Sequence, residues 1–258
     1  MIGLIYFLVI VAANTVGAIS GMGGGVLIKP IFDFIGAHSL AAISFYSSMA
    51  VFTMSIVSTI RQLKNKVTIH WGKALLISVG SMGGGVLGNS AFEWILRFSS
   101  ERTTQIVQIV LTIITLLFAL IYSKKEAFSF SCQISVVYVF VGFILGFLAS
   151  LLGIGGGPIN VAMLMLFFGL TIKEATVYSI ITIFFSQSSK LFAIFLSSSY
   201  QRYDLSLFLF IIPAAILGGW FGAKVSGVLP ADKVNTVYQG VIILVLLINC
   251  FNGIKLFF

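Results

Sequence analysis

Two glycine-rich pentapeptides are the residues of this sequence whose type and spacing best suit ligand binding. They are Gly21-Met22-Gly23-Gly24-Gly25 and, 132 positions later, Gly153-Ile154-Gly155-Gly156-Gly157. Each follows a long apolar run and precedes a short apolar segment, residues 26–35 and residues 158–168. An apolar run, a glycine break and a truncated run are typical of a discontinuous membrane helix.

The chemistry that these breaks favour is the binding of an anion. Glycine has no Cβ, so the backbone N–H groups of a glycine run are approachable. N–H groups at the start of a helix attract negative charge. We therefore predict that both breaks contribute to one small-anion site within the membrane, through Gly23, Gly24, Gly25, Gly155, Gly156 and Gly157. The alternative is that the glycines only let helices pack closely. A phosphate loop is excluded because neither run leads into Gly-Lys-Ser/Thr.

Lys190 is the most informative single charge. It lies well inside an apolar span, where an ionisable group costs several kcal/mol unless it is solvated or paired. Either it serves the anion site or its side chain extends to the nearer membrane interface beyond Phe195. Lys29 and Asp33 are four residues apart and are expected to pair with each other. The alternative is that Lys29 is a charge near the entrance of the anion site.

Hydroxyl and amide side chains near the breaks could donate to the oxygens of an anion. They could equally bond to carbonyls of their own helices, which requires no ligand. Asn160 lies in the first turn after the second break, where its counterpart is the apolar Ile28. The substrate-binding candidates of this kind are Tyr46, Ser47, Tyr178, Ser179, Gln187 and Asn160.

The composition excludes a soluble protein. Of 258 residues, 59% are hydrophobic and only 9% are charged, against about 25% charged in soluble domains. The chain is therefore expected to be an all-α, multi-pass membrane protein whose partners are the lipid bilayer and a small anion. The basic residues are scattered around helix ends, so anchoring to lipid headgroups explains the net charge of +8 better than nucleic acid does. No catalytic motif and no metal-ligand spacing is present, so we expect no enzyme, no cofactor and no metal.

About eight spans are expected, arranged in two related halves. The second glycine pattern also repeats, since residues 84–88 resemble residues 218–222. We place the halves at residues 1–126 and 127–258. The predicted spans are residues 2–19, 40–60, 72–96, 103–122, 134–152, 172–195, 205–225 and 234–251.

The relative orientation of the halves depends on how the short segments after the breaks are counted. An odd number of crossings per half gives inverted copies and an even number gives parallel copies. If only the eight long spans cross, the face that bears both termini collects eight Lys and Arg against six, which favours cytoplasmic termini. Glycine pairs four residues apart could pack helices inside one chain or between the two chains of a homodimer; the pairs are Gly84/Gly88, Gly142/Gly146 and Gly218/Gly222.

Together these motifs resemble the sulfite exporter TauE/SafE family. The resemblance rests on the two glycine breaks after a first and a fifth span, the Tyr-Ser pair in each following helix, the Gly-Gly-x-x-Gly helices and the Leu229-Pro230-x-x-Lys233 entry to the last span. It covers nearly the whole chain. It implies an inner-membrane transporter with two related halves that moves sulfite or organosulfonates by alternating access. A passive anion channel and a non-transporting packing or sensor protein are the alternatives.

Overall fold

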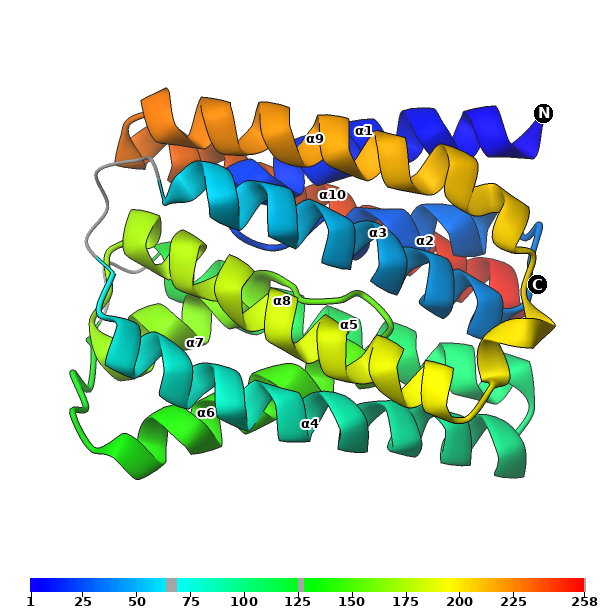
Figure 1. Cartoon of the computed structure of the whole chain (residues 1–258), viewed down its shortest axis with the longest axis horizontal. Coiled ribbons are helices and arrows are strands. Elements are labelled where there is room, and N and C mark those ends of the chain that lie inside the picture. The colour runs from blue at the N-terminus through cyan, green and yellow to red at the C-terminus, as the bar shows by residue number, and fades with distance from the viewer. Residues whose placement is uncertain (64–68, 125–127, 258) are drawn as a thin grey trace.

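The computed structural model describes residues 1–63, 69–124 and 128–257, and the regular secondary structure of these residues is all helical (Figure 1). The expected all-α fold is confirmed. The helices are α1 (Ile2–Ser20), α2 (Gly25–Ile35), α3 (Leu40–Gln62), α4 (Trp71–Phe98), α5 (Glu101–Lys124), α6 (Ser135–Leu151), α7 (Pro158–Phe168), α8 (Ile172–Leu196), α9 (Phe208–Val228) and α10 (Ala231–Phe257), with two short 3-10 helices, η1 (Ser199–Arg202) and η2 (Leu205–Leu207). The predicted boundary between the halves, at residues 126 and 127, lies outside the described residues.

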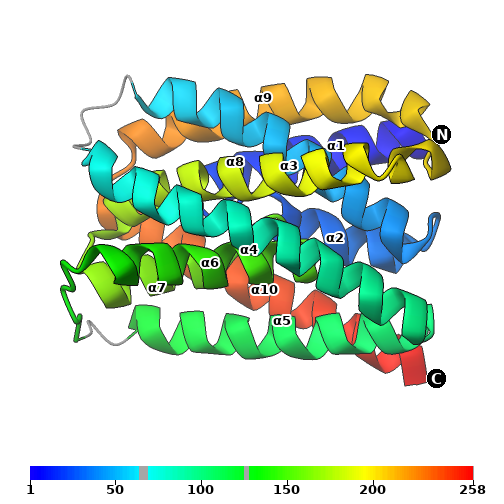
Figure 2. The ribbon, with the colours of Figure 1, turned by 60° about the horizontal axis from the view of Figure 1, so that its bottom comes forward.

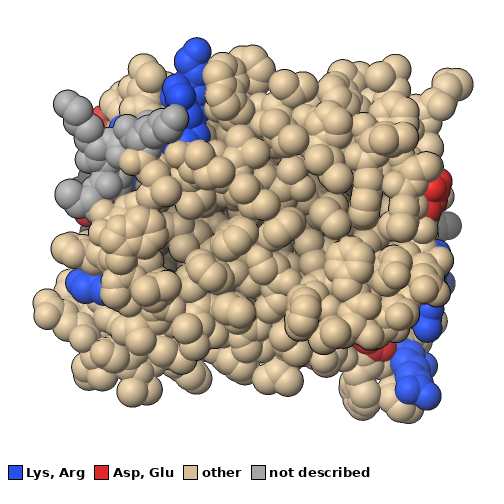
Figure 3. Space-filling view, viewed as in Figure 1, with Lys and Arg blue, Asp and Glu red and all other residues tan. Residues whose placement is uncertain are grey.

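The chain is built to cross a membrane several times. Among the described helices, seven are long and apolar enough to span the bilayer: α1, α3, α4, α5, α8, α9 and α10. The eighth expected span, α6, is apolar but has 17 residues. Figure 3 shows charged side chains at the two ends of the molecule and a broad uncharged band between them, as expected for a protein that exposes this band to lipid.

The first glycine break turns α1 and α2 into a hairpin that returns to the face where it started. Tyr6, near the start of α1, stacks on Phe32, near the end of α2, with ring centroids 3.7 Å apart. The hydroxyl of Tyr6 also lies 2.8 Å from Nδ1 of His38, in the connection to α3. The predicted short segment of residues 26–35 is therefore a half-length helix that does not complete a crossing.

The second break forms the equivalent hairpin from the other side of the molecule. Tyr138, at the start of α6, stacks on Phe168, at the end of α7, with centroids 4.0 Å apart. Nζ of Lys73, at the start of α4, lies 5.8 Å from the centroid of the same Tyr138 ring. Each half thus consists of one re-entrant hairpin and three full spans, and Figures 1 and 2 show the two hairpins entering from opposite ends. An odd number of net crossings makes the halves inverted, which settles the alternative that the sequence left open.

This topology corrects the expected distribution of charge between the faces. Both chain ends lie at one end of the molecule (Figure 1), which we call the terminus face; the other end is the opposite face. Because the hairpins return, the connection before α4 belongs to the opposite face and the connection after α4 to the terminus face. The described basic residues at helix ends then number six on the opposite face against four on the terminus face: Arg61, Lys73, Lys124, Lys173, Lys224 and Lys233 against Arg97, Arg102, Arg202 and Lys255. The condition behind the expected cytoplasmic termini, eight crossing spans, is not met, and the recounted charges favour a cytoplasmic opposite face instead.

The re-entrant topology predicts which side of the membrane reaches two residues of α4. In a background with Cys132 and Cys250 replaced by serine, Arg97→Cys should react with a membrane-impermeant thiol reagent from the side that reaches tags on both termini. Lys73→Cys should react from the other side only. A chain that crosses with eight spans and no re-entrant hairpin would give the reverse assignment, so labelling of oriented vesicles decides between the two topologies.

Glycines pack the long helices so closely that no side chain would fit between them. A Cβ on Gly84 of α4 would lie 2.0 Å from the carbonyl oxygen of Phe143 in α6, and one on Gly146 would lie 2.2 Å from the carbonyl oxygen of Ser81. In the other half, a Cβ on Gly222 of α9 would lie 2.3 Å from the carbonyl oxygen of Thr15 in α1. The glycine pairs therefore serve packing inside one chain, as small residues do in membrane helices.

Candidate anion-binding site

The first three residues of the two glycine breaks repeat the same backbone path, whereas the fourth residues differ, with φ of −70° at Gly24 and 154° at Gly156. Gly21 and Gly153 have φ values of 76° and 69°, and Gly23 and Gly155 have 76° and 68°. These left-handed conformations are accessible to glycine at little cost, whereas a side chain disfavours them. The amide of the third residue of each break donates to a carbonyl six residues earlier, Gly23 to Gly17 at 3.3 Å and Gly155 to Ala149 at 3.2 Å. Glycine is therefore required here by the turn itself.

The breaks meet each other inside the molecule. A Cβ on Gly25 would lie 1.9 Å from the carbonyl oxygen of Ile154 in the second break, and a Cβ on Gly156 would lie 3.0 Å from the carbonyl oxygen of Met22 in the first. Residues far apart in the sequence are thus in backbone contact where the hairpins overlap. Whether the site binds an anion stays a prediction, but the predicted meeting of the two breaks is observed.

Both half-length helices present free amides at this meeting point. Among the described residues, no acceptor is found for the N–H groups of Gly24, Gly25 and Val26 in the first break, or for those of Gly156, Gly157 and Ile159 in the second. The N-terminus of each helix carries a partial positive charge of about half an elementary charge. The two N-termini together therefore form an electropositive, hydrogen-bond-donating region.

The C-terminal ends of α1 and α6 point carbonyl oxygens into the same region, and hydrogen-bond donors of other helices cap these oxygens. Ser179 donates to the carbonyl of Gly21 at 2.6 Å, and Thr176 donates to that of Ser20 at 3.5 Å. Nζ of Lys190 lies 3.5 Å from the carbonyl of Ser150 at the end of α6. Negative helix ends are thus matched by donors, while the positive helix ends are left open. Ser179, a predicted substrate ligand, has a structural bond in this conformation.

Lys190 points inward and does not extend to the interface. Its side chain is 1% exposed, and Nζ donates to Oγ of Ser44 at 2.9 Å. The same Ser44 Oγ would lie 2.8 Å from a Cβ on Gly153, so the ammonium group is beside the second break. Within the described residues the ion pair found is between Lys29 and Asp33, with a separation of 2.6 Å, as the sequence predicted. Lys190 therefore adds a positive charge that no carboxylate neutralises by direct contact.

Several buried polar atoms around the breaks have no partner among the described residues. Oγ of Ser47 is one, and it would lie 2.9 Å from a Cβ on Gly25. The hydroxyl of Ser150 and the side-chain oxygens of Asn160 and Gln187 are further examples. Unpaired buried polar groups are rare and costly, so their concentration here is a sign of a ligand or water site. Ser47, Asn160, Gln187 and Lys190 stay candidates for substrate contact.

Asn14 belongs to this group and was not predicted from the sequence. It is fully buried in α1, its Oδ1 has no partner among the described residues, and that atom would lie 1.8 Å from a Cβ on Gly24. The signal that could have identified it is a single amide inside an otherwise apolar span, which in a membrane helix is a functional candidate by default.

Tyr46 and Tyr178 are placed away from the breaks. The hydroxyl of Tyr46 accepts from the amide of Asp204 at 3.0 Å and donates to its carbonyl at 3.2 Å. The hydroxyl of Tyr178 is bonded in the same way to the backbone of His70, at 2.8 and 3.4 Å. These equivalent bonds attach α3 to the connection that precedes α9, and α8 to the connection that precedes α4. The structure therefore gives both tyrosines a positioning role in this conformation and does not bring them to the site.

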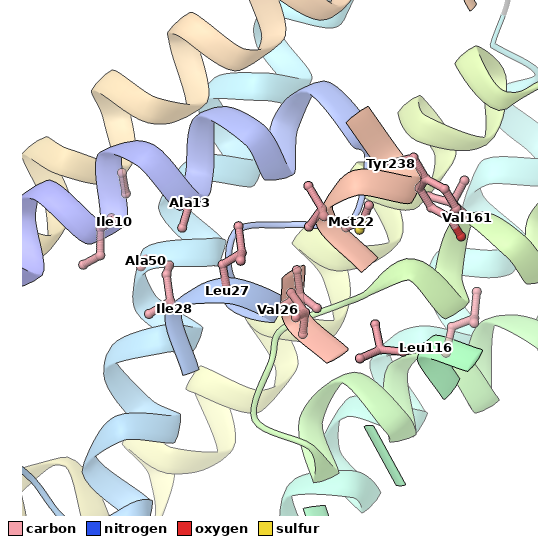
Figure 4. Close-up of a cluster of buried hydrophobic side chains, with 14 of the residues drawn as sticks. Ile10, Ala13, Met22, Val26, Leu27, Ile28, Ala50, Leu116, Val161 and Tyr238 are labelled. Carbon is pink, nitrogen blue, oxygen red and sulfur yellow. The ribbon is translucent and has the colours of Figure 1, made fainter. Parts of the chain in front are cut away.

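The meeting point is closed to solvent. Residues 17–30 and residues 149–162 are buried without exception, and these two runs are related by the same 132-residue offset as the breaks. Figure 4 shows Met22 and Val26 of the first break beside the α10 segment that carries Tyr238. The hydroxyl of Tyr238 donates to the carbonyl of Pro158 at 2.7 Å and fixes the start of α7. The site is therefore occluded in this conformation.

Comparisons with known proteins agree with the membrane fold described above. A family model described as "Sulfite exporter TauE/SafE" matches residues 6–249. The chain is similar to the probable membrane transporter protein YunE of Bacillus subtilis (strain 168), with 26% identity over 259 residues that cover 90% of this chain and 92% of that protein. No solved structure matches the chain significantly.

Proposed function

Because the chain belongs to the sulfite exporter TauE/SafE family, we propose that it carries sulfite or organosulfonates across the cell membrane by alternating access. The family and the name of the relative both point to a membrane transporter and not to an enzyme. The single observation that carries the finer proposal is the contact between two half-length helices whose free N-termini lie beside the buried ammonium group of Lys190.

The charge of the site suits a small oxyanion. Two helix N-termini contribute about half an elementary charge each, and Lys190 contributes one more. Sulfite and sulfonates have three oxygens on one sulfur, so they can accept hydrogen bonds from several directions at once. Backbone N–H groups and the hydroxyls of Ser47 and Ser150 supply such donors without adding full charges. Neutral donors bind weakly enough to release the anion again, which a carrier requires.

An occluded site favours a carrier over a passive channel. A channel needs a continuous wet pore, whereas both breaks are buried on all sides in this conformation. The inverted halves supply the two related states that alternating access needs, because exchanging the conformations of the halves would open the site to the other face. Transport should therefore be saturable, and anion on one side should accelerate exchange with anion on the other.

Reconstitution in liposomes tests this proposal. Purified protein should release radiolabelled sulfite or a labelled organosulfonate from loaded liposomes with saturable kinetics, and unlabelled substrate outside should accelerate the release. Chloride at the same concentration should not. Unsaturable flux without exchange would indicate a channel instead. Flux equal to that of protein-free liposomes with every sulfur oxyanion tried would favour a sensor or packing protein and would overturn the proposal.

A further inference from the structure

A second charged feature lies on the terminus face, outside the site already described. A cavity of about 910 Å³ opens between the last turns of α4, the last turns of α8 and η1. We call it the terminus-face cavity. Its polar lining includes Asn89, Ser90, Glu93, Arg97, Ser199 and Arg202. The guanidinium groups of Arg97 and Arg202 form no ion pair and donate no hydrogen bond within the described part of the chain.

The charge balance of this cavity is positive, with two guanidinium groups against the carboxylate of Glu93. Glu93 lies one turn before Arg97 on the same face of α4. Glu93 also acts on Tyr203, whose pKa is raised to about 12 by burial first and by this carboxylate second. The phenol therefore stays protonated and adds no negative charge. Unpaired arginines with planar, multiple donors are well suited to oxyanions.

The inner end of the cavity leads toward Lys190. Ala193 and Ile194 of α8 line it, and Lys190 lies one turn deeper on the same face of this helix, a rise of about 6 Å. Below that level α4 and α8 close together, since a Cβ on Gly85 would lie 2.5 Å from Oγ of Ser189. Ile194 is 4% exposed and separates the cavity from the ammonium group.

The positions of the other half that correspond to Glu93 and Lys190 carry no charge. The 134-residue offset between α4 and α9 places Gly227 opposite Glu93. The 132-residue offset between α3 and α8 places Ser58 opposite Lys190. A device needed only for packing would be expected in both inverted halves. Glu93 and Lys190 are therefore not explained by the packing that the two halves share.

We propose that the terminus-face cavity is a separate anion-docking site, in which Arg97 and Arg202 hold a small sulfonate or other oxyanion before it passes Ile194 toward Lys190. The onward passage rests on the proposed transport function, whereas docking does not. Glu93 keeps this docking weak, so that the anion is not trapped at the entrance.

Thiol labelling tests docking without any transport. In a background with Cys132 and Cys250 replaced by serine, Ala193→Cys places a thiol in the cavity wall. A thiosulfonate reagent with a sulfonate head should label it about tenfold faster than an equally sized reagent with a trimethylammonium head, because a charged cleft raises the local concentration of the opposite charge. The double change Arg97→Gln and Arg202→Gln should remove this preference, and added salt should weaken it. The exposed Lys233→Gln on the opposite face is the matched control and should leave it unchanged.

Equal labelling rates for the two reagents, or a preference that survives loss of both arginines, would overturn the docking site. In the liposome assay the two arginine variants should raise KM severalfold with little change in maximal rate, while Glu93→Gln should lower KM. If unmodified protein moves no sulfur oxyanion, the transport proposal fails, and the labelling ratio still decides whether the cavity docks anions. If transport occurs and KM is unaffected by both arginines, the onward route through this cavity is wrong.

Discussion

Gly25→Ala is expected to suppress transport strongly while the protein still inserts in the membrane. The new Cβ would lie 1.9 Å from the carbonyl oxygen of Ile154 and 2.6 Å from the carbon of the same group. Both are backbone atoms of the second break, so no side chain can rotate away to relieve the contact. The two breaks must separate, which costs about 1–3 kcal/mol as overpacking does in other interiors. If that cost falls on the state that binds the anion, transport at low substrate drops by about 5- to 150-fold.

Gly240→Ala and Gly72→Ala are the matched controls, because a Cβ at either position meets no atom within 4 Å. Both variants should transport like the unmodified protein. Size-exclusion profiles in detergent should be alike for all three variants, which separates loss of the site from loss of the fold. Normal rates for Gly25→Ala would show that the contact between the breaks is irrelevant to transport.

Lys190→Met is expected to raise the stability of the protein and to abolish most of its anion binding. A buried ammonium group bonded to one hydroxyl and one carbonyl costs free energy. An apolar side chain of similar length removes that cost, as replacement of buried charges by hydrophobic residues often stabilises proteins by about 1–4 kcal/mol. The anion, in contrast, loses a full positive charge that no carboxylate pairs with among the described residues. Loss of a charged hydrogen bond of about 1.5–3 kcal/mol weakens binding by roughly tenfold or more.

The comparison variant is Lys29→Met, which removes the same charge from a neighbouring helix. It leaves the buried carboxylate of Asp33 without its partner, so it should destabilise the protein by about 3–5 kcal/mol. Thermal unfolding in detergent and sulfite efflux from liposomes measure the two properties separately. A Lys190→Met protein that is less stable, or that transports with unchanged affinity, would show that Lys190 is a structural residue.

Much of the fold could be predicted from the chain because it depends on local patterns. Apolar runs longer than about twenty residues give membrane helices regardless of their neighbours. The glycine runs end helices where they occur, because residues such as Gly21 and Gly153 adopt a left-handed backbone that side chains disfavour. The 132-residue repeat is likewise a property of the sequence. These features identified the helical class, the two broken helices and the candidate residues of the breaks.

The tertiary structure decided what each polar residue does. Tyr46 and Tyr178 have the same sequence surroundings as Ser47 and Ser179, yet the rotation of their helices turns the tyrosines toward backbone in distant connections. Lys190 could extend to the interface or turn inward, and it turns inward because Ser44 and Ser150 on neighbouring helices offer it acceptors. The folded chain alone brings the side chain of Asn14 beside Gly24.

The topology could not be predicted from the sequence either. A half-length apolar segment has the same composition whether it completes a crossing or returns to the face from which the chain entered. The stacking of Tyr6 on Phe32 and of Tyr138 on Phe168 decides that both segments return. Hydrophobicity and backbone preference act over neighbouring residues, so the sequence by itself determined the helices and their breaks. Which faces meet depends on packing between segments more than a hundred residues apart, and this only the folded chain determines.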